Sequence, residues 1–319
     1  MKLGIIMDPI TGINVRKDSS FAMLLAAQAL GWELFYMEMP DLFIDGCTPC
    51  ARMRRLTVAD NTERWFEFGV ENTAELSRLD IILMRKDPPV DMEYIYTTQI
   101  LELAQEAGVY VVNDPSALRA ENEKLFIHRF PDCIAPTLVT SDEQRIVEFA
   151  HVHTDIILKP LGHMGGASVF RLRKHDTNLH VIIETLTANG ARLAMAQRYI
   201  PEIARGDKRI LLIDGEPVPY ALARIPKQGE HRGNLASGGT GKGVELSQRD
   251  REICAQLGPV LRARGLLFAG IDVIGDYLTE INITSPTCIR ELDALFKLNI
   301  AGDLMQTIAT HIQGGTGRR

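Results

Sequence analysis

The 319-residue sequence lacks the features that define several large classes of protein. It has no uncharged apolar run near the roughly 18–20 residues that a membrane-spanning helix needs. Basic residues are not in excess, because 35 Lys and Arg stand against 41 Asp and Glu, and the net charge of −6 argues against a nucleic-acid partner. The first residues reach Asp8-Pro9 too early for a secretory signal. We therefore expect a cytoplasmic protein with neither a membrane nor a nucleic-acid partner.

Cysteine is scarce, and the spacing of the five cysteines fits a reducing compartment better than a disulfide framework. Cys47 and Cys50 have the spacing of a redox motif, but they lie in an irregular stretch and no second pair completes a zinc site. No carboxylate partner pattern accompanies His151, His153, His175 or His180. The Gly-x-Ser-x-Gly elbow of serine hydrolases is missing as well. The sequence therefore favours neither thiol nor histidine chemistry.

Strand-like and helix-like patterns alternate through the first 120 residues. The expected strands are Leu3–Met7, Glu33–Met37, Asp80–Met84 and Val109–Val112, and the expected helices are 18–30 and Tyr94–Ala107. This alternation predicts an α/β lobe of parallel strands joined by right-handed crossovers. Residues 41–75 break the alternation and are expected to form an inserted hairpin and loop. At 35.5 kDa the chain exceeds what one core fills, so one or two further lobes are expected.

The pattern after residue 121 is that of an α+β chain. A helix is expected at Glu121–Phe130, and four later strands are expected to form one largely antiparallel sheet. Those strands are Val169–Leu172, Leu193–Tyr199, Lys208–Ile213 and Glu216–Arg224, the last two joined by a tight turn at Asp214-Gly215. Residues 226–243 are rich in glycine without apolar periodicity, which predicts a lid or a disordered loop. The chain is expected to end with a helix at Leu246–Gly265, a hairpin from Leu267 to Ile281, and helices at Cys288–Phe296 and Asn299–Gln313.

The most informative stretch, residues 267–290, contains Asp272, Glu280 and Asn282. Asp272 interrupts an apolar run, where a carboxylate is costly to bury unless it is paired or bound to a metal. Glu280 and Asn282 lie two apart on a predicted strand and so project from one face. A three-residue loop at 275–277 puts Asp272 on that face too, whereas a two-residue turn puts the two carboxylates on opposite faces. Three oxygen ligands suit a hard cation such as Mg²⁺ bound with phosphates; the alternative is a capped hairpin with solvated acids.

Lys159 lies near the end of the apolar strand Asp155–Pro160 and precedes a glycine-rich turn at 161–168. Glycine lets backbone N–H groups approach an anion and the lysine supplies positive charge, so the pattern predicts a phosphate clamp. It differs from the Walker motif, whose lysine follows the glycines and opens a helix. The alternative is a glycine-rich turn with an incidental lysine.

Several arginines occupy strand ends, a βα junction or the glycine-rich segment. They are Arg85, Arg209, Arg224 and Arg232, and Lys86 follows the first of them. Ligands of open α/β sheets bind at such βα junctions, and guanidinium groups clamp carboxylates and transferring phosphates with bidentate geometry. Taken singly, each arginine is more often a solvated surface charge, and only their occurrence together favours the clamp.

Eight segments of the sequence resemble bacterial glutathione synthetases, which are ATP-grasp ligases. They are Met7–Pro9, Lys17–Met23, Leu83–Pro89, Asn122–Leu125, Ile157–Leu161, Gly206–Arg209, Arg232–Ala236 and Thr279–Thr287, and the last two are the most specific. The resemblance covers nearly the whole chain and implies an ATP-grasp fold with an N-terminal parallel α/β lobe and two α+β lobes that clasp ATP. It implies lobes at 1–121, 122–200 and 201–319, with 226–243 as the lid.

The resemblance also implies a reaction and a role for each candidate residue. The family joins γ-glutamylcysteine to glycine with ATP and Mg²⁺, with Mn²⁺ as an alternative ion, and favours homo-oligomers such as a homotetramer. Implied nucleotide contacts are Lys124, Lys159, Gly165, Gly166, Gln197, Tyr199, Ile200 and Asp207, and implied metal ligands are Asp272, Glu280 and Asn282. Implied dipeptide contacts are Arg85, Lys86, Ser285 and Thr287, and implied catalytic residues are Arg209, Arg224 and Arg232.

The sequence departs from the family pattern in one place. After the Lys-Pro strand the family has Asp-Gly-x-Gly-Gly, whereas this sequence has Gly162-His163 in place of Asp-Gly.

Two alternative functions would use some of the same residues. A small-molecule kinase would use the same nucleotide site but release ADP without an amine acceptor. A nucleotide-binding regulator would keep Lys124 and Lys159 but could lose the metal residues, all three of which are present.

Overall fold

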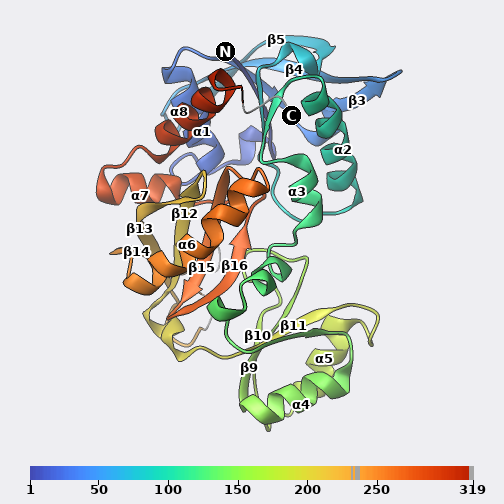
Figure 1. The fold of residues 1–319 in the computed structure, drawn as a ribbon, viewed down its shortest axis with the longest axis vertical. Coiled ribbons are helices and arrows are strands. Elements are labelled where there is room, and N and C mark those ends of the chain that lie inside the picture. Colours follow the sequence, from blue (N-terminus) through green and yellow to red (C-terminus); the bar gives the residue numbers. More distant parts are fainter. Residues whose placement is uncertain (231–232, 234–237, 316–319) are drawn as a thin grey trace.

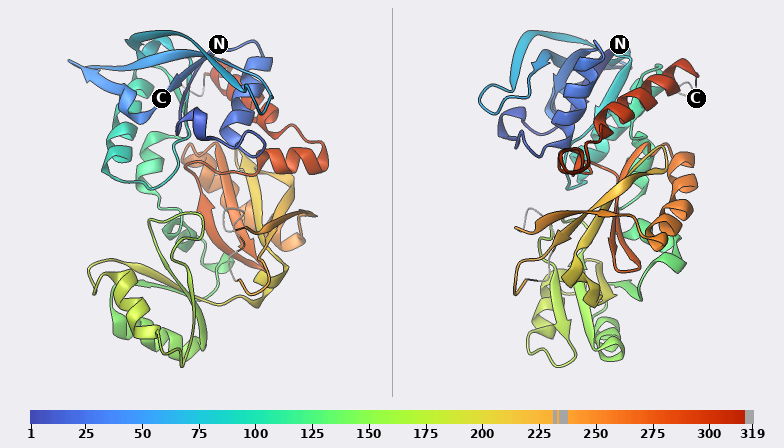
Figure 2. Two further views of the ribbon diagram at one scale, coloured as in Figure 1. Left: turned by 180° about the vertical axis from the view of Figure 1, so that it is seen from behind. Right: turned by 90° about the vertical axis from the view of Figure 1, so that its left-hand side faces the viewer.

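The computed structural model describes residues 1–230, 233 and 238–315, and within them the chain forms three β-sheets. The lobes built on these sheets are stacked along the long axis of the molecule (Figure 1), and the side views show the same order (Figure 2). The third sheet lies in the middle, between the first and the second. None of the described helices is long and apolar enough to cross a membrane.

The first sheet belongs to the N-terminal lobe. Its strands are β1 (Lys2–Ile6), β2 (Glu33–Met37), β3 (Leu42–Asp45), β4 (Thr48–Val58), β5 (Phe66–Glu75), β6 (Ile81–Met84) and β7 (Tyr110–Val112), and its helices are α1 (Ser19–Ala29), α2 (Met92–Glu106) and α3 (Pro115–Ala120). Strands β2, β1, β6 and β7 pair in parallel, which confirms the predicted α/β lobe. The insertion at 41–75 contains the antiparallel strands β3, β4 and β5, so it adds three strands to the edge of this sheet.

The later strands form two sheets, so the expectation of one antiparallel sheet was wrong. The second sheet contains β8 (Thr137–Thr140), β9 (Asp155–Pro160), β10 (Phe170–Arg173) and β11 (Ala194–Arg198), with helices α4 (Glu143–His153) and α5 (Leu179–Thr187). The third sheet contains β12 (Asp207–Ile213), β13 (Glu216–Ile225), β14 (Thr240–Glu245), β15 (Phe268–Ile274) and β16 (Tyr277–Asn282). A 3₁₀ turn at Pro201–Arg205 and Gly206, at φ +114°, redirect the chain between β11 and β12.

Two further sequence predictions required correction. Strand β14 occupies part of the predicted loop 226–243, where the lack of apolar residues hid the strand. A side chain at Gly243 would meet the ring of Phe296, which explains the glycine there. The expected helix Glu121–Phe130 is only a 3₁₀ turn at Leu125–Arg129, because residues 122–124 run along β16 instead.

Helices α6 (Gln248–Ala263), α7 (Ile289–Phe296) and α8 (Ile300–Gln313) complete the structure. The last of these returns to the N-terminal lobe and lies beside α1, although the two helices are at opposite ends of the sequence (Figure 1). Two apolar cores run from the first sheet into the third, whereas a separate core lies under the second sheet. The lobe of the second sheet is therefore the most independently packed part, while the boundaries at 121/122 and 200/201 stay predictions.

The packing of α8 predicts that Leu304→Ala destabilises the whole N-terminal lobe. Leu304 is fully buried in the core that contains Phe21 and Leu24 of α1. Its truncation should lower the free energy of unfolding by about 2–5 kcal/mol, as measured by urea denaturation. Leu295→Ala is the control, because Leu295 is half exposed and its loss should cost no more than about 0.5 kcal/mol. Equal effects of the two substitutions would contradict the prediction.

Candidate functional site

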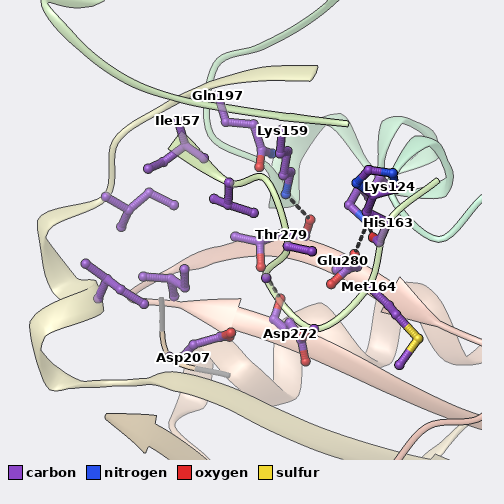
Figure 3. A pocket seen from close by; sticks show the side chains of 18 of the residues that line it. Lys124, Ile157, Lys159, His163, Met164, Gln197, Asp207, Asp272, Thr279 and Glu280 are labelled. Carbon is purple, nitrogen blue, oxygen red and sulfur yellow. Dashed lines mark hydrogen bonds and ion pairs between the residues drawn. The ribbon is translucent and has the colours of Figure 1, made fainter. Parts of the chain in front are cut away.

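A pocket with about 870 Å³ of unfilled space lies between the second and third sheets. We call it the inter-sheet pocket, and Figure 3 shows side chains entering it from both sheets. All eight residues expected to contact a nucleotide line it: Lys124, Lys159, Gly165, Gly166, Gln197, Tyr199, Ile200 and Asp207. Residues spread over more than 80 positions of the chain thus form one continuous surface.

Two buried lysines lie at one end of the inter-sheet pocket. The ammonium group of Lys124 is 2.8 Å from Glu280 Oε1 and donates a 2.6 Å hydrogen bond to the carbonyl oxygen of His163. Lys159 donates to the carbonyl oxygen of Thr279 at 3.4 Å, and burial lowers the pKa of Lys159 to about 8. Two cationic groups at one end of a pocket suit a polyanion such as a polyphosphate.

The glycine-rich turn after β9 borders the same end of the pocket. Gly165 and Gly166 have φ values of +66° and +79°, a conformation that other residues adopt at a cost. His163, which departs from the family pattern, holds Lys124 through its backbone carbonyl. That contact does not depend on the identity of the side chain.

The opposite end of the inter-sheet pocket is largely apolar. Ile157, Ile200 and Ile274 line it beside Tyr199, whose ring is stacked under the guanidinium of Arg171 at 3.6 Å. Such a slot suits a flat ring system.

Asp207 places a buried carboxylate oxygen without a partner in this pocket. Its Oδ2 accepts a 2.5 Å hydrogen bond from Arg224, whereas Oδ1 has no hydrogen-bond partner within the described part of the chain. Burial raises the pKa of Asp207 to about 6, and the nearby negative charge of Asp272 adds to the shift. An orphaned acceptor of this kind calls for a donor from a bound molecule, and a ligand hydroxyl fits.

The β15–β16 hairpin brings the three metal candidates together by a route that the sequence left open. The turn has two residues, because Ile274 pairs with Tyr277, and this alone would separate the carboxylates. A β-bulge between Asp272 and Val273 shifts the register, so that Asp272 lies opposite Glu280 after all. Asn282 follows two residues later on β16.

The carboxylates of the hairpin are ion-paired. Both oxygens of Asp272 are held by Arg209, with Nε 2.6 Å from Oδ1, and Arg224 Nη2 is 2.9 Å from Oδ2. These two guanidinium groups hold the pKa of Asp272 well below its usual range although burial acts in the opposite direction. Glu280 pairs with Lys124. The described residues contain no cluster of three or more His, Cys, Asp or Glu side chains, so an ion here would take two carboxylates and the Asn282 amide.

A second pocket, which we call the junction pocket, adjoins the first and shares Met164, Gly165 and Glu280 with it. Its walls contain Arg209, Arg224, Ser285 and Thr287, four of the residues predicted to bind or activate a substrate. The hydroxyl of Ser285 donates to Asp87, which also lines the pocket and which the sequence did not single out.

Among the described residues, Arg85 and Lys86 do not line the junction pocket. Arg85 is buried behind it and donates to Ser20 Oγ at 3.0 Å and to the carbonyl of Pro286 at 2.9 Å. Lys86 pairs with Asp8 at 2.7 Å. Arg232 lies outside the described residues, as do parts of the predicted lid.

Glu123 is a further residue of the junction pocket that the sequence did not single out. It lines the junction pocket and accepts three hydrogen bonds from the segment after β16. Its only signal in the sequence was its place in the segment Asn122–Leu125, which contributed to the resemblance without indicating a role for the carboxylate.

Burial of Lys159 predicts that Lys159→Met stabilises the protein at neutral pH. Below about pH 8 the ammonium is charged in the folded and unfolded states, and its burial is unfavourable. Between that pH and the ordinary lysine pKa of 10.5 the folded state has lost the proton that the unfolded state still binds, so the penalty fades as pH rises. The variant should gain roughly 2–3 kcal/mol at pH 7 and little above pH 10.5.

Urea denaturation of wild type and variant across this pH range measures the effect. Lys174→Met is the matched control, because Lys174 is exposed and should show no pH-dependent gain. A Lys159→Met variant less stable than wild type at pH 7 would be incompatible with this account.

The sequence matches two protein-family models and is similar to curated proteins over nearly its whole length. The family model of the prokaryotic glutathione synthetase N-terminal domain matches residues 1–119, and that of its ATP-grasp domain matches residues 123–297. The glutathione synthetase of Pseudomonas aeruginosa is 59% identical over 312 residues, covering 98% of each chain. That of Escherichia coli O127:H6 is 56% identical over 313 residues, covering 98% of this chain and 99% of the relative.

Solved structures with low sequence identity share the fold. D-cycloserine synthetase DcsG aligns with a TM-score of 0.69 at 14% identity, over 98% of this chain and all of the other. The ATP-grasp ligase PsnB, in a complex with minimal precursor, Mg and ADP, aligns with a TM-score of 0.63 at 16% identity over 98% of both chains. With matching domain models and close full-length relatives, the chain belongs to the prokaryotic glutathione synthetases, a family of ATP-grasp ligases.

Proposed function

We propose that the two adjoining pockets divide the substrates of the glutathione synthetase reaction between them. As a member of its family, the chain joins γ-glutamylcysteine to glycine with ATP, releasing ADP and phosphate. ATP would occupy the inter-sheet pocket and the dipeptide the junction pocket. The observation that carries this assignment is the shared wall, in which Gly165 and Glu280 border both pockets.

The lining of the inter-sheet pocket favours one orientation of the nucleotide. The apolar slot beside Tyr199 and Ile200 would receive the adenine, and the orphaned oxygen of Asp207 would accept a hydrogen bond from a ribose hydroxyl. The triphosphate would then extend toward Lys124, Lys159 and the glycine turn, whose Gly165 also lines the junction pocket. This orientation directs the terminal phosphate at the dipeptide.

The hairpin residues would hold the metal ion of the reaction. Asp272, Glu280 and Asn282 supply oxygen donors, the ligand type that Mg²⁺ prefers, with Mn²⁺ as the alternative. When bound, the ion neutralises phosphate charge during phosphoryl transfer. One structural neighbour, PsnB, was solved with Mg and ADP.

Amide formation requires that a carboxylate oxygen becomes a leaving group. The cysteinyl carboxylate attacks the γ-phosphorus of ATP and ADP leaves, and the resulting acyl phosphate is attacked at carbon by the glycine amine, which expels phosphate. Arg209 and Arg224 face the junction pocket and would stabilise the negative charge that develops in both steps. Ser285 and Thr287 would position the dipeptide with hydroxyl groups.

The location of Arg224 predicts that Arg224→Ala impairs catalysis more than nucleotide binding. Loss of a preorganised cation facing the reacting groups should lower kcat by about 10²–10³-fold, with a smaller rise in KM for ATP because Arg224 also pairs with Asp207. Steady-state kinetics would measure both constants. Arg262→Ala is the control, because Arg262 bonds to the carbonyl of Asp214, on the turn between β12 and β13. Small and equal changes in the two constants would refute the catalytic role.

The proposed reaction predicts that ADP release requires both organic substrates. Coupled assays would measure ADP with γ-glutamylcysteine and glycine together and with each omitted, and mass spectrometry would identify the product. We expect fast ADP release and glutathione only in the complete mixture. Full-rate ADP release without glycine would favour the kinase alternative.

We also propose a cytoplasmic location and a homo-oligomeric state, with a homotetramer as the expected form. The small number of cysteines and their irregular spacing support the first, and the oligomers expected for the family support the second. Sedimentation velocity would measure the state of assembly.

A further inference from the structure

Residues 122–124, which follow α3, run along the free edge of β16. The backbone carbonyl of Glu123 accepts a 2.9 Å hydrogen bond from Ile281 N. Its side-chain Oε1 accepts from Ile283 N at 2.8 Å, from Thr284 N at 3.0 Å and from the Thr284 hydroxyl at 2.9 Å. One residue of the linker therefore satisfies four donors at and just beyond the end of β16.

The segment held in this way carries side chains of the junction pocket. Ser285 and Thr287 line that pocket directly after the residues bonded to Glu123. Two other side chains hold the same segment through its carbonyl groups, because Asn113 donates to Ile283 O at 2.7 Å and Arg85 donates to Pro286 O at 2.9 Å. Glu123 is thus the partner that satisfies the N–H groups, while Asn113 and Arg85 satisfy the carbonyls.

Consecutive residues of the linker serve different pockets. Glu123 lines the junction pocket, whereas Lys124 lines the inter-sheet pocket and pairs there with Glu280. Loss of the Glu123 side chain would leave the Lys124 ion pair in place. The two pockets can therefore be perturbed separately by substitution at neighbouring positions.

The chemistry of position 123 favours a carboxylate. Burial and the negative charge of Glu280 raise the pKa of Glu123, while the hydrogen bonds from Thr284 and Ile283 oppose that shift. Three donors converging on one oxygen form charge-assisted hydrogen bonds with an ionised carboxylate, which are stronger than those with a neutral group. A glutamine keeps the acceptor oxygen but weakens these bonds, and an alanine removes the acceptor and leaves buried donors unpaired.

We infer that Glu123 is a positioning residue for the dipeptide, acting by fixing residues 283–287 so that Ser285 and Thr287 face the bound γ-glutamylcysteine. This inference rests on the proposed assignment of the dipeptide to the junction pocket. This positioning role is distinct from nucleotide binding. Within the described part of the chain, the side chain of Glu123 forms no hydrogen bond with any residue assigned to ATP.

Kinetics of three variants test the inference. Glu123→Ala should raise KM for γ-glutamylcysteine about tenfold and leave KM for ATP within about twofold. Glu123→Gln should restore KM for the dipeptide to within about threefold of wild type. Thr284→Val removes only the hydroxyl donor and should raise KM for the dipeptide by about two- to fivefold, which keeps the test decisive if Glu123→Ala does not fold.

Glu121→Ala is the matched control. Glu121 is a buried carboxylate two residues earlier in the same linker, paired with Arg129 at 3.1 Å and with Arg264. Its loss should lower stability without separating the two KM values. A parallel rise in both KM values for the Glu123 and Thr284 variants, or the same separation in Glu121→Ala, would overturn the inference.

The result also separates this inference from the proposed function. If wild type makes no glutathione from the complete mixture, the proposed function fails whatever the variants do. If wild type makes glutathione and the variants show no selective change in KM for the dipeptide, only the role of Glu123 fails.

Discussion

A buried network of two arginines and two aspartates lies where the two pockets meet. Arg209 and Arg224 both pair with Asp272, and Arg224 also pairs with Asp207. All four side chains are buried, so each charge depends on the others for compensation. The groups proposed to bind metal, ribose and acyl phosphate are thus mutually paired in the structure. This compensation lets a protein with an ordinary core hold so much charge at the centre of the molecule.

The arrangement of the sheets places this network beside both pockets. The third sheet lies between the other two and contributes all four charged residues, from β12, β13 and β15. The second sheet, with its own core, covers the network from one side and supplies Lys159 and the glycine turn. The loops after β6 and β16 close the other side. Residues of all three lobes thus surround the network.

Much of this was accessible from the sequence, and the exceptions have physical reasons. The residues predicted to contact a nucleotide line one pocket because their motifs are local, each consisting of a strand end and its turn, while their role stays a prediction. The pairing of Asp272 with Glu280 depended on a bulge, which periodicity alone does not reveal. The division into two sheets depended on a redirection at Gly206 that a pattern of strands does not encode.

Long-range contacts explain two features that the sequence did not reveal. The guanidinium of Arg85, whose contact with the dipeptide stays a prediction, donates to Ser20 and Pro286, which are far from it in sequence. Glu123 went unrecognised for the same reason, since its partners lie about 160 positions later in the chain. A side chain whose role is to hold a distant backbone segment shows no periodic signal of its own.

The position of α8 has a consequence for the order in which the molecule can be assembled during synthesis. The face of α1 is covered by α8, which is synthesised after the other described helices and strands. The buried core of the second sheet, in contrast, is drawn from residues 146–196, so it can condense before α8 is made. The N-terminal lobe is therefore completed only once α8 has been synthesised, and until then its apolar surface depends on the surroundings of the nascent chain for protection from aggregation.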